Sequence, residues 1–182
     1  ICNSEATRAD LEAFLALAGI ERPVTTVPLA QDFSSVKESV FRHADRRRSA
    51  EIAEVFASAH YMVGLREQIQ NALAVPFVLY VGTIEARKNV WRLAQAWKRL
   101  AEKNEIELPR LVLAGRLGSR IEDFADFMEG TGSCGGFIRI CEAPSDEELG
   151  LLYKYCEFTV MPSLYEGWGL PVGEALSYGK TS

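Results

Sequence analysis

The sequence Phe77-Val78-Leu79-Tyr80-Val81-Gly82 follows a proline, is apolar throughout and ends at a glycine. A continuous apolar run of this length is typical of a parallel strand that is buried on both faces of a sheet. A second run of the same kind is Leu111-Val112-Leu113-Ala114-Gly115. Between the two runs, residues 90–102 carry apolar side chains at helical spacing. These segments together predict a βαβ unit with parallel strands.

The alternation of helices and strands continues toward the C-terminus. Its segments are a helix over 121–128, a strand over 137–140, a helix that begins at Ser145, a strand over 158–161 and a last helix with Pro171 near its start and Gly179 beyond its end. This order predicts an α/β fold of the Rossmann-like class, in which helices flank a parallel sheet.

The first part of the chain is less regular. Ser4 predicts the start of a helix that stops at Gly19, and the β-branched run Val24-Thr25-Thr26-Val27 predicts a short strand. From residue 34 to about 73 the composition favours one or two charged helices. The triplet Arg46-Arg47-Arg48 is interpreted as a solvated helix face, with a phosphate or membrane contact as the alternative.

The overall composition excludes several classes of function. The chain has 182 residues and a formal net charge of −5, which argues against a nucleic-acid partner because such proteins present a basic face. No apolar stretch is long enough to span a membrane, and the first residues do not read as a signal peptide, so we expect a cytoplasmic protein. We expect no metal site, and we expect the cysteines to be free thiols, because they lack the spacing of zinc ligands or a disulfide framework: Cys2, Cys134, Cys141 and Cys156.

Residues 130–135 satisfy the glycine pattern GxGxxG, which in a dinucleotide site follows a strand and opens a helix. Here the glycines follow a predicted helix and lead into a strand. We therefore interpret Gly130-Thr131-Gly132-Ser133-Cys134-Gly135 as a flexible turn.

The loop from Gly82 to Asn89 lies between a predicted strand and a helix, which is where open α/β sheets bind ligands. It carries Arg87 and Lys88. A guanidinium fork and an ammonium group both suit a diphosphate leaving group. An ordinary basic loop remains the alternative.

The segment from Pro162 to Leu176 has the same position before the last helix. Its glycines allow a ligand to approach the backbone, and the start of the helix favours an anion. Glu166 is predicted in the loop and Glu174 in the first helical turn, where both carboxylates can accept hydrogen bonds from sugar hydroxyls. For Glu174 the alternative is a carboxylate that only complements the helix dipole.

The glutamates Glu166 and Glu174, together with the Gly82 to Asn89 loop, resemble the retaining GT-B glycosyltransferases of the glycogen-synthase-like and mannosyltransferase-like group. The resemblance covers residues 76–182. It implies that Glu174 holds the ribose, that Glu166 contacts the transferred sugar, and that Lys88 and Arg87 neutralise the diphosphate. It also implies a lining of the nucleotide-sugar site by Gly82, Thr83, Ser163, Gly167, Trp168, Gly169 and Leu170, with Glu142 and Ala143 near the base.

The same resemblance suggests a domain division. Residues 1–33 are predicted to end an N-terminal, acceptor-side domain, 34–75 to form a helical connection and 76–182 to form an incomplete donor-binding domain, so we expect the chain to be a fragment. Two features depart from the family pattern. Thr83 stands where many relatives have an arginine, and neither His43 nor His60 matches the histidine that relatives place against the sugar.

The resemblance implies transfer of a hexose with retention, without a metal or other cofactor. GDP-mannose is the preferred nucleotide-sugar, with UDP- and ADP-sugars as alternatives. The acceptor is expected to be a glycan or a lipid-linked glycan, and peripheral association with the inner face of a membrane stays open. We expect the isolated chain to bind its nucleotide without transferring sugar. A nucleotide-sugar-binding module without catalysis, and less favoured a glycoside hydrolase with two carboxylates, are the alternatives.

Overall fold

The structure of the chain is a computed structural model, which describes residues 2–27 and 66–182. Its helices and strands are, in chain order, α1 (Glu5–Leu17), α4 (Glu67–Leu73), β1 (Phe77–Val81), the 3-10 helix η2 (Ala86–Lys88), α5 (Val90–Lys103), β2 (Arg110–Gly115), α6 (Glu122–Gly130), α7 (Gly132–Gly135), β3 (Ile138–Glu142), α8 (Asp146–Tyr155) and α9 (Leu170–Ser177).

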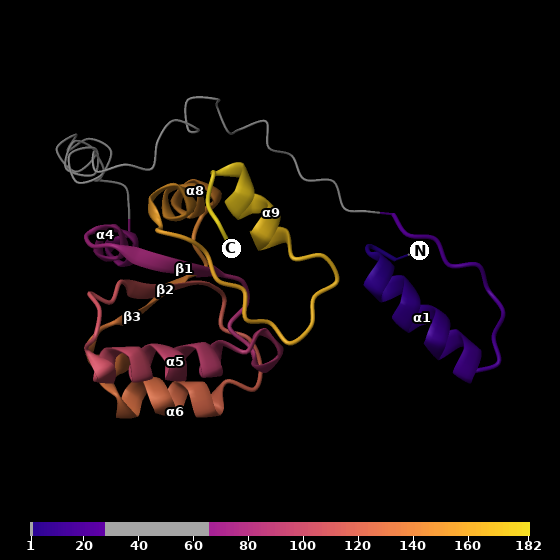
Figure 1. Cartoon of the computed structure of the whole chain (residues 1–182), viewed down its shortest axis with the longest axis horizontal. Coiled ribbons are helices and arrows are strands. Elements are labelled where there is room, and N and C mark those ends of the chain that lie inside the picture. The colour runs from indigo at the N-terminus through magenta and orange to yellow at the C-terminus, as the bar shows by residue number, and fades with distance from the viewer. Residues whose placement is uncertain (1, 28–65) are drawn as a thin grey trace.

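The strands form a parallel sheet in the order β1-β2-β3, as the sequence predicted. Helices α5 and α6 lie on one side of it, and α4, α8 and α9 lie on the other (Figure 1). Because successive side chains of a strand point to opposite faces, Phe77 and Leu79 pack toward α4 and α8, whereas Val78 and Tyr80 pack toward α5 and α6. Two buried apolar layers therefore hold the sheet, and the α/β class is confirmed.

Several predicted elements are present, with bounds that differ from the prediction by up to two residues. Ser4 caps α1 by accepting a hydrogen bond from Thr7, and α5 extends one residue beyond the predicted 90–102. The third strand was predicted over 137–140 but runs over 138–142. At the start of α8, Ser145 and Glu148 form a reciprocal capping box. This local pair explains why the predicted start of α8 was correct.

Two predicted strands are wrong. Residues 24–27 form only an isolated parallel bridge, between Thr26 and Cys2. Among the described residues, no extended segment runs beside them over more than this one position. Residues 158–161 also form a single bridge, between Thr159 and Leu79. They lie along β1 through two backbone hydrogen bonds, and a third joins the preceding Glu157 to Phe77. On their other side, Thr181 is their only backbone hydrogen-bond partner in the described part of the chain, so no ladder develops. β-branched composition alone does not make a strand without a partner.

The glycine-rich segment at 130–135 follows α6 and precedes β3, which confirms that it lacks the context of a dinucleotide site. Its residues 132–136 all have positive φ, from 54° to 87°, and so make a left-handed turn. Thr131 stabilises the turn by accepting a hydrogen bond from the Cys134 amide.

Some sequence predictions lie outside the described residues. They include His43, His60, Arg46-Arg47-Arg48 and most of the predicted helical connection. Within residues 2–27 and 66–182, no helix combines the length and apolar character needed to cross a membrane. Because the predicted boundary near residue 33 and most of the connection lie outside the described residues, the domain bounds stay a prediction.

Candidate functional site

Two loops that are far apart in the sequence meet at the carboxyl end of β1. One connects β1 to α5, and the other precedes α9. The Leu164 amide donates to the carbonyl of Arg87 at 3.1 Å, and Asn89 Nδ2 donates to the carbonyl of Pro162 at 3.0 Å. Arg87 Nη1 also donates to the carbonyl of Tyr165 at 2.9 Å. The two loops thus lie side by side, as predicted.

A charged cluster joins the two loops. Lys88 Nζ lies 2.5 Å from Glu166 Oε1, and Arg87 Nη1 lies 3.5 Å from Glu166 Oε2. Arg87 also binds Glu85 at 2.9 Å. The Lys88 and Glu166 side chains are only 15% and 23% exposed, so this ion pair is less screened by solvent than a surface pair.

Burial raises the pKa of the Glu166 carboxyl, but the nearby Lys88, Ser163 and Arg87 groups together lower it below its usual value. Glu166 is therefore an anion at neutral pH. The Ser163 hydroxyl is buried and does not meet hydrogen-bond geometry with any described residue. It lies beside Glu166, whose pKa it helps to lower.

The carboxyl ends of β1 and β2 approach each other closely at Gly82 and Gly115. A methyl group on Gly115 would lie 2.0 Å from the Gly82 carbonyl oxygen. Thr83 follows Gly82, and its methyl group faces Gly118 so closely that a Cβ there would lie 2.7 Å away. The Thr83 side chain therefore packs toward the loop after β2. Arg116, at the end of β2, is exposed at the same edge of the sheet.

Sequence reasoning did not select Arg116, although it follows a strand that ends in glycine, which is the signal that singled out the Gly82 loop. It also missed Arg66. The Arg66 guanidinium binds both carboxylate oxygens of Glu148 and donates to the carbonyls of Glu142 at 2.9 Å and Ala143 at 3.1 Å. Arg66 therefore fastens the loop at the end of β3, where the base was expected.

Arg66 and the Ser145 amide lower the pKa of the Glu148 carboxyl to about 2, against the opposing effect of burial. A lowered pKa stabilises the folded state above the unfolded pKa of 4.5, and this contribution is lost as the pH falls from there toward 2. Glu148→Gln should thus lower the free energy of unfolding at pH 7 by roughly 1–2 kcal/mol, a discounted value because solvent screens Arg66. The difference from the parent should shrink below about pH 4.5, as urea titrations at several pH values would measure.

The neighbouring Glu147→Gln is the matched control, because Glu147 lies in the same first turn but is exposed. It should change the unfolding free energy by less than about 0.5 kcal/mol at every pH. A pH-independent deficit in Glu148→Gln would contradict the role of the ion pair.

The last loop and α9 contain the remaining predicted residues. Gly169 precedes α9 with φ +80°, a left-handed conformation that favours glycine. Trp168 and Leu170 are both exposed. Gly167 faces the N-terminal segment, since a Cβ there would lie 3.0 Å from Asn3 Oδ1. The backbone at Gly167 is thus already covered, unlike the neighbouring Trp168 side chain.

The prediction that Glu174 lies in the first turn of the last helix is wrong. The helix starts at Leu170, and Pro171 is its second residue, which places Glu174 in the second turn. Its carboxylate therefore lies outside the first turn, where it would offset the positive end of the helix dipole. Glu174 Oε2 instead accepts a hydrogen bond from the Tyr153 hydroxyl at 2.6 Å.

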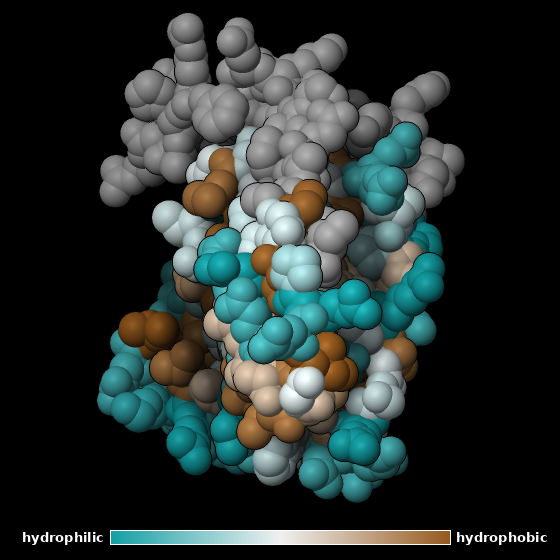
Figure 2. All heavy atoms as spheres, turned by 90° about the vertical axis from the view of Figure 1, so that its right-hand side faces the viewer, coloured by the Kyte–Doolittle hydropathy of each residue, from teal (hydrophilic) through white to brown (hydrophobic). Residues whose placement is uncertain are grey.

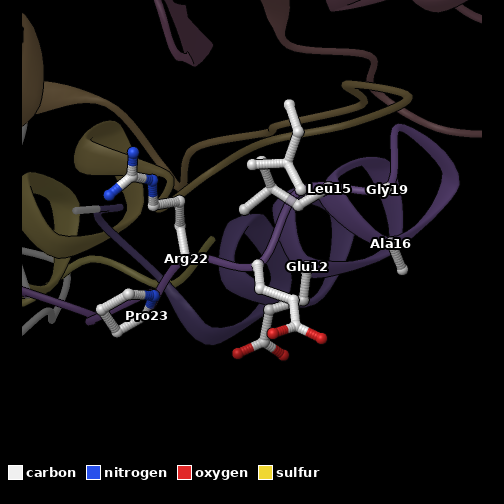
Figure 3. Close-up of a pocket in the computed structure, with 8 residues that line it drawn as sticks. Glu12, Leu15, Ala16, Gly19, Arg22 and Pro23 are labelled. Carbon is white, nitrogen blue, oxygen red and sulfur yellow. The ribbon is translucent and has the colours of Figure 1, made fainter.

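One hollow of the molecule is lined by none of the residues of these two loops. It has a volume of about 610 Å³ and is lined by α1 and the residues that follow it, among them Glu12, Arg22 and Pro23. In Figure 3 the Arg22 guanidinium and the Glu12 carboxylate point in different directions. Figure 2 views the molecule from the α1 side and shows apolar side chains among polar ones. None of the predicted site residues lines this hollow.

Comparisons with known proteins give a consistent result. A family model described as glycosyl transferases group 1 matches residues 65–181. O-antigen chain mannosyltransferase B of Escherichia coli is 39% identical over 103 residues, which are 57% of this chain and 26% of that protein. The serotype-specific mannosyltransferase WbdA of Escherichia coli is 28% identical over 133 residues, 72% of this chain and 16% of that protein. The chain thus spans only a minor part of these relatives.

Solved structures show the same fold. Sucrose-phosphate synthase from Thermosynechococcus elongatus has a TM-score of 0.58 and 21% identity, with 98% of this chain and 38% of that chain covered. Anabaena HepE, in complex with UDP and glucose, has a TM-score of 0.61 and 13% identity, with 98% of this chain and 42% of that chain covered.

Proposed function

The chain belongs to the glycosyl transferases group 1 family, and we propose that it binds the nucleoside diphosphate part of a nucleotide-sugar from which a hexose is transferred. The observation that carries this proposal is the pair of cations, Lys88 and Arg87, at the end of β1 beside Glu166. Cations held at the carboxyl edge of a parallel sheet suit a diphosphate.

We propose GDP-mannose as the nucleotide-sugar and a glycan or lipid-linked glycan as the acceptor. The choice of mannose is supported by the names of the Escherichia coli relatives, both mannosyltransferases. We also propose that the anomeric configuration is retained, as the resemblance to retaining GT-B glycosyltransferases implies. The leaving diphosphate would be stabilised by Lys88, Arg87 and the start of α9, which makes electrostatic stabilisation the main catalytic contribution.

The first test is calorimetry of the chain with GDP, UDP and ADP. We expect GDP to bind most tightly, and a lack of binding to all three would overturn the proposal. A nucleotide-sugar-binding module without catalysis is the second candidate. Transfer of mannose from GDP-mannose to a glycan would exclude this candidate. Hydrolysis of an aryl glycoside, lost in Glu166→Gln, would instead support a hydrolase.

Lys88→Ala should weaken GDP binding about tenfold, because a partly buried ammonium that contacts a phosphate is replaced by a methyl group. Guanosine binding should stay unchanged, since the nucleoside does not use that charge. Calorimetry with both ligands measures the difference.

The control is Lys98→Ala on α5. Lys98 is more exposed and pairs with Glu102 within its own helix. This variant removes the same charge from the chain and should leave GDP affinity within about twofold of the parent. Equal losses for GDP and guanosine in Lys88→Ala would argue against a phosphate contact.

A further inference from the structure

Tyr153 is a tyrosine of α8 whose side chain is buried between α8 and α9. Its hydroxyl lies 2.6 Å from Glu174 Oε2, and 3.5 Å from the carbonyl of Pro171. The shorter contact is a charge-assisted hydrogen bond, which is stronger than a neutral one. The hydroxyl is thus directed at the carboxylate rather than at the backbone.

The Tyr153 ring is held in place by its neighbours. It stacks on Tyr178, with ring centroids 5.4 Å apart and planes 13° apart. Burial, and then Glu174, raise the pKa of the Tyr153 hydroxyl, so it stays protonated and donates at neutral pH. A rigid ring with a fixed hydroxyl limits the orientations that the Glu174 carboxylate can take.

Glu174 itself has acceptor capacity left. Within the described part of the chain it has no ion-pair partner, and its Oε1 accepts no hydrogen bond. The side chain is half-buried rather than enclosed. An oriented carboxylate with one oxygen already bonded and the other available suits a hydroxyl of a ligand.

We propose that Tyr153 is a positioning residue that orients Glu174 so that its free oxygen accepts a ribose hydroxyl of the bound nucleotide. This inference rests on the proposed function. Tyr153 does not touch the nucleotide and acts only through Glu174. Its effect should therefore appear with nucleotides that carry ribose hydroxyls and vanish when these are absent.

The test compares GDP with 2′,3′-dideoxy-GDP by calorimetry on the parent chain, Tyr153→Phe and Tyr178→Phe. Tyr153→Phe keeps the buried ring and removes only the hydroxyl. We expect it to weaken GDP binding roughly fivefold, as the loss of one hydrogen bond would, and to leave dideoxy-GDP binding unchanged. Tyr178→Phe removes a hydroxyl from the stacked partner and should match the parent. In a Glu174→Gln background, Tyr153→Phe should have less than half of its effect on GDP binding.

Each other outcome has a distinct meaning. If the parent binds no nucleoside diphosphate, the proposed function fails and the inference fails with it. If the parent binds GDP more tightly than dideoxy-GDP, but Tyr153→Phe weakens both equally or neither, the sugar-nucleotide site stands and the positioning role is overturned. Melting temperatures of the two phenylalanine variants identify a loss that is due to unfolding.

Discussion

Gly115→Ala is expected to destabilise the α/β unit severely. The added methyl group would lie 2.0 Å from the Gly82 carbonyl oxygen and 2.7 Å from its carbon, where no side chain can move aside because both atoms belong to the backbone. The φ of 156° at Gly115 adds strain for any residue with a Cβ. To relieve the clash, β1 and β2 must separate at their carboxyl ends.

The separation would break several contacts at once. The Gly82 amide donates to the carbonyl of Ala114, and the Ile84 amide donates to the carbonyl of Arg116. We expect a loss above about 4 kcal/mol, against a typical total stability of about 5–15 kcal/mol. Circular dichroism during heating should show no cooperative transition, or one at a much lower temperature than in the parent.

Gly130→Ala is the matched control. Gly130 ends α6, and a Cβ there meets no atom within 4 Å. Alanine favours helix over glycine by up to about 1 kcal/mol, so this variant should melt at or slightly above the parent temperature. A melting temperature of Gly115→Ala close to that of the parent would contradict the close approach of the two strands.

The parts of the fold that the sequence predicted well are those in which local pattern and tertiary environment agree. β1 and β2 are buried on both faces, so their sequences are apolar throughout. A further parallel strand was predicted over 158–161, and it placed the loop of Glu166 at the same edge of the sheet as the loop after β1. This is why Lys88 and Glu166, which are 78 positions apart, were expected near each other and form an ion pair.

Other features depend on contacts that no local pattern announces. Arg66 reaches Glu148 across 82 positions, and only the folded chain brings them together. In the sequence, Tyr153 looks like one more apolar position of a helix. The role of its hydroxyl becomes visible only in the fold, where it donates to the Glu174 carboxylate. The position of Glu174 was misjudged because Pro171 is the second helical residue and not the first. A shift of one residue at a helix start is within the ordinary variation of capping.

The largest expected effect on ligand selectivity belongs to Glu166→Gln. In the structure, the Glu166 carboxylate forms ion pairs with Lys88 and Arg87, the two cations that the diphosphate is proposed to bind. A diphosphate must displace this carboxylate from Lys88 and Arg87. Glutamine has nearly the same shape but no charge, so it releases both cations and removes a repulsive anion. We therefore expect GDP to bind about tenfold more tightly to Glu166→Gln than to the parent.

For GDP-mannose, this gain at the diphosphate should be offset by a loss at the sugar. If Glu166, once displaced, accepts a hydrogen bond from a mannose hydroxyl, glutamine weakens that contact by about one charged hydrogen bond, or roughly tenfold. The ratio of GDP-mannose affinity to GDP affinity should then fall by about tenfold, because the gain at the two cations is common to both ligands and cancels. Calorimetry with both ligands at one ionic strength measures this ratio directly.

Glu85→Gln separates this effect from a general change of charge. The Glu85 side chain is 25% exposed, similar to Glu166, and binds Arg87 at 2.9 Å. The Glu85→Gln variant leaves the ion pair of Lys88 and Glu166 intact. We therefore expect the affinity for GDP to rise by no more than about threefold, and the affinity for GDP-mannose to change to the same extent. If Glu166→Gln behaves like Glu85→Gln, Glu166 contacts neither the cations nor the sugar in the way proposed. If it weakens GDP, the ion pair with Lys88 organises the phosphate site, and the idea of a competing carboxylate is wrong.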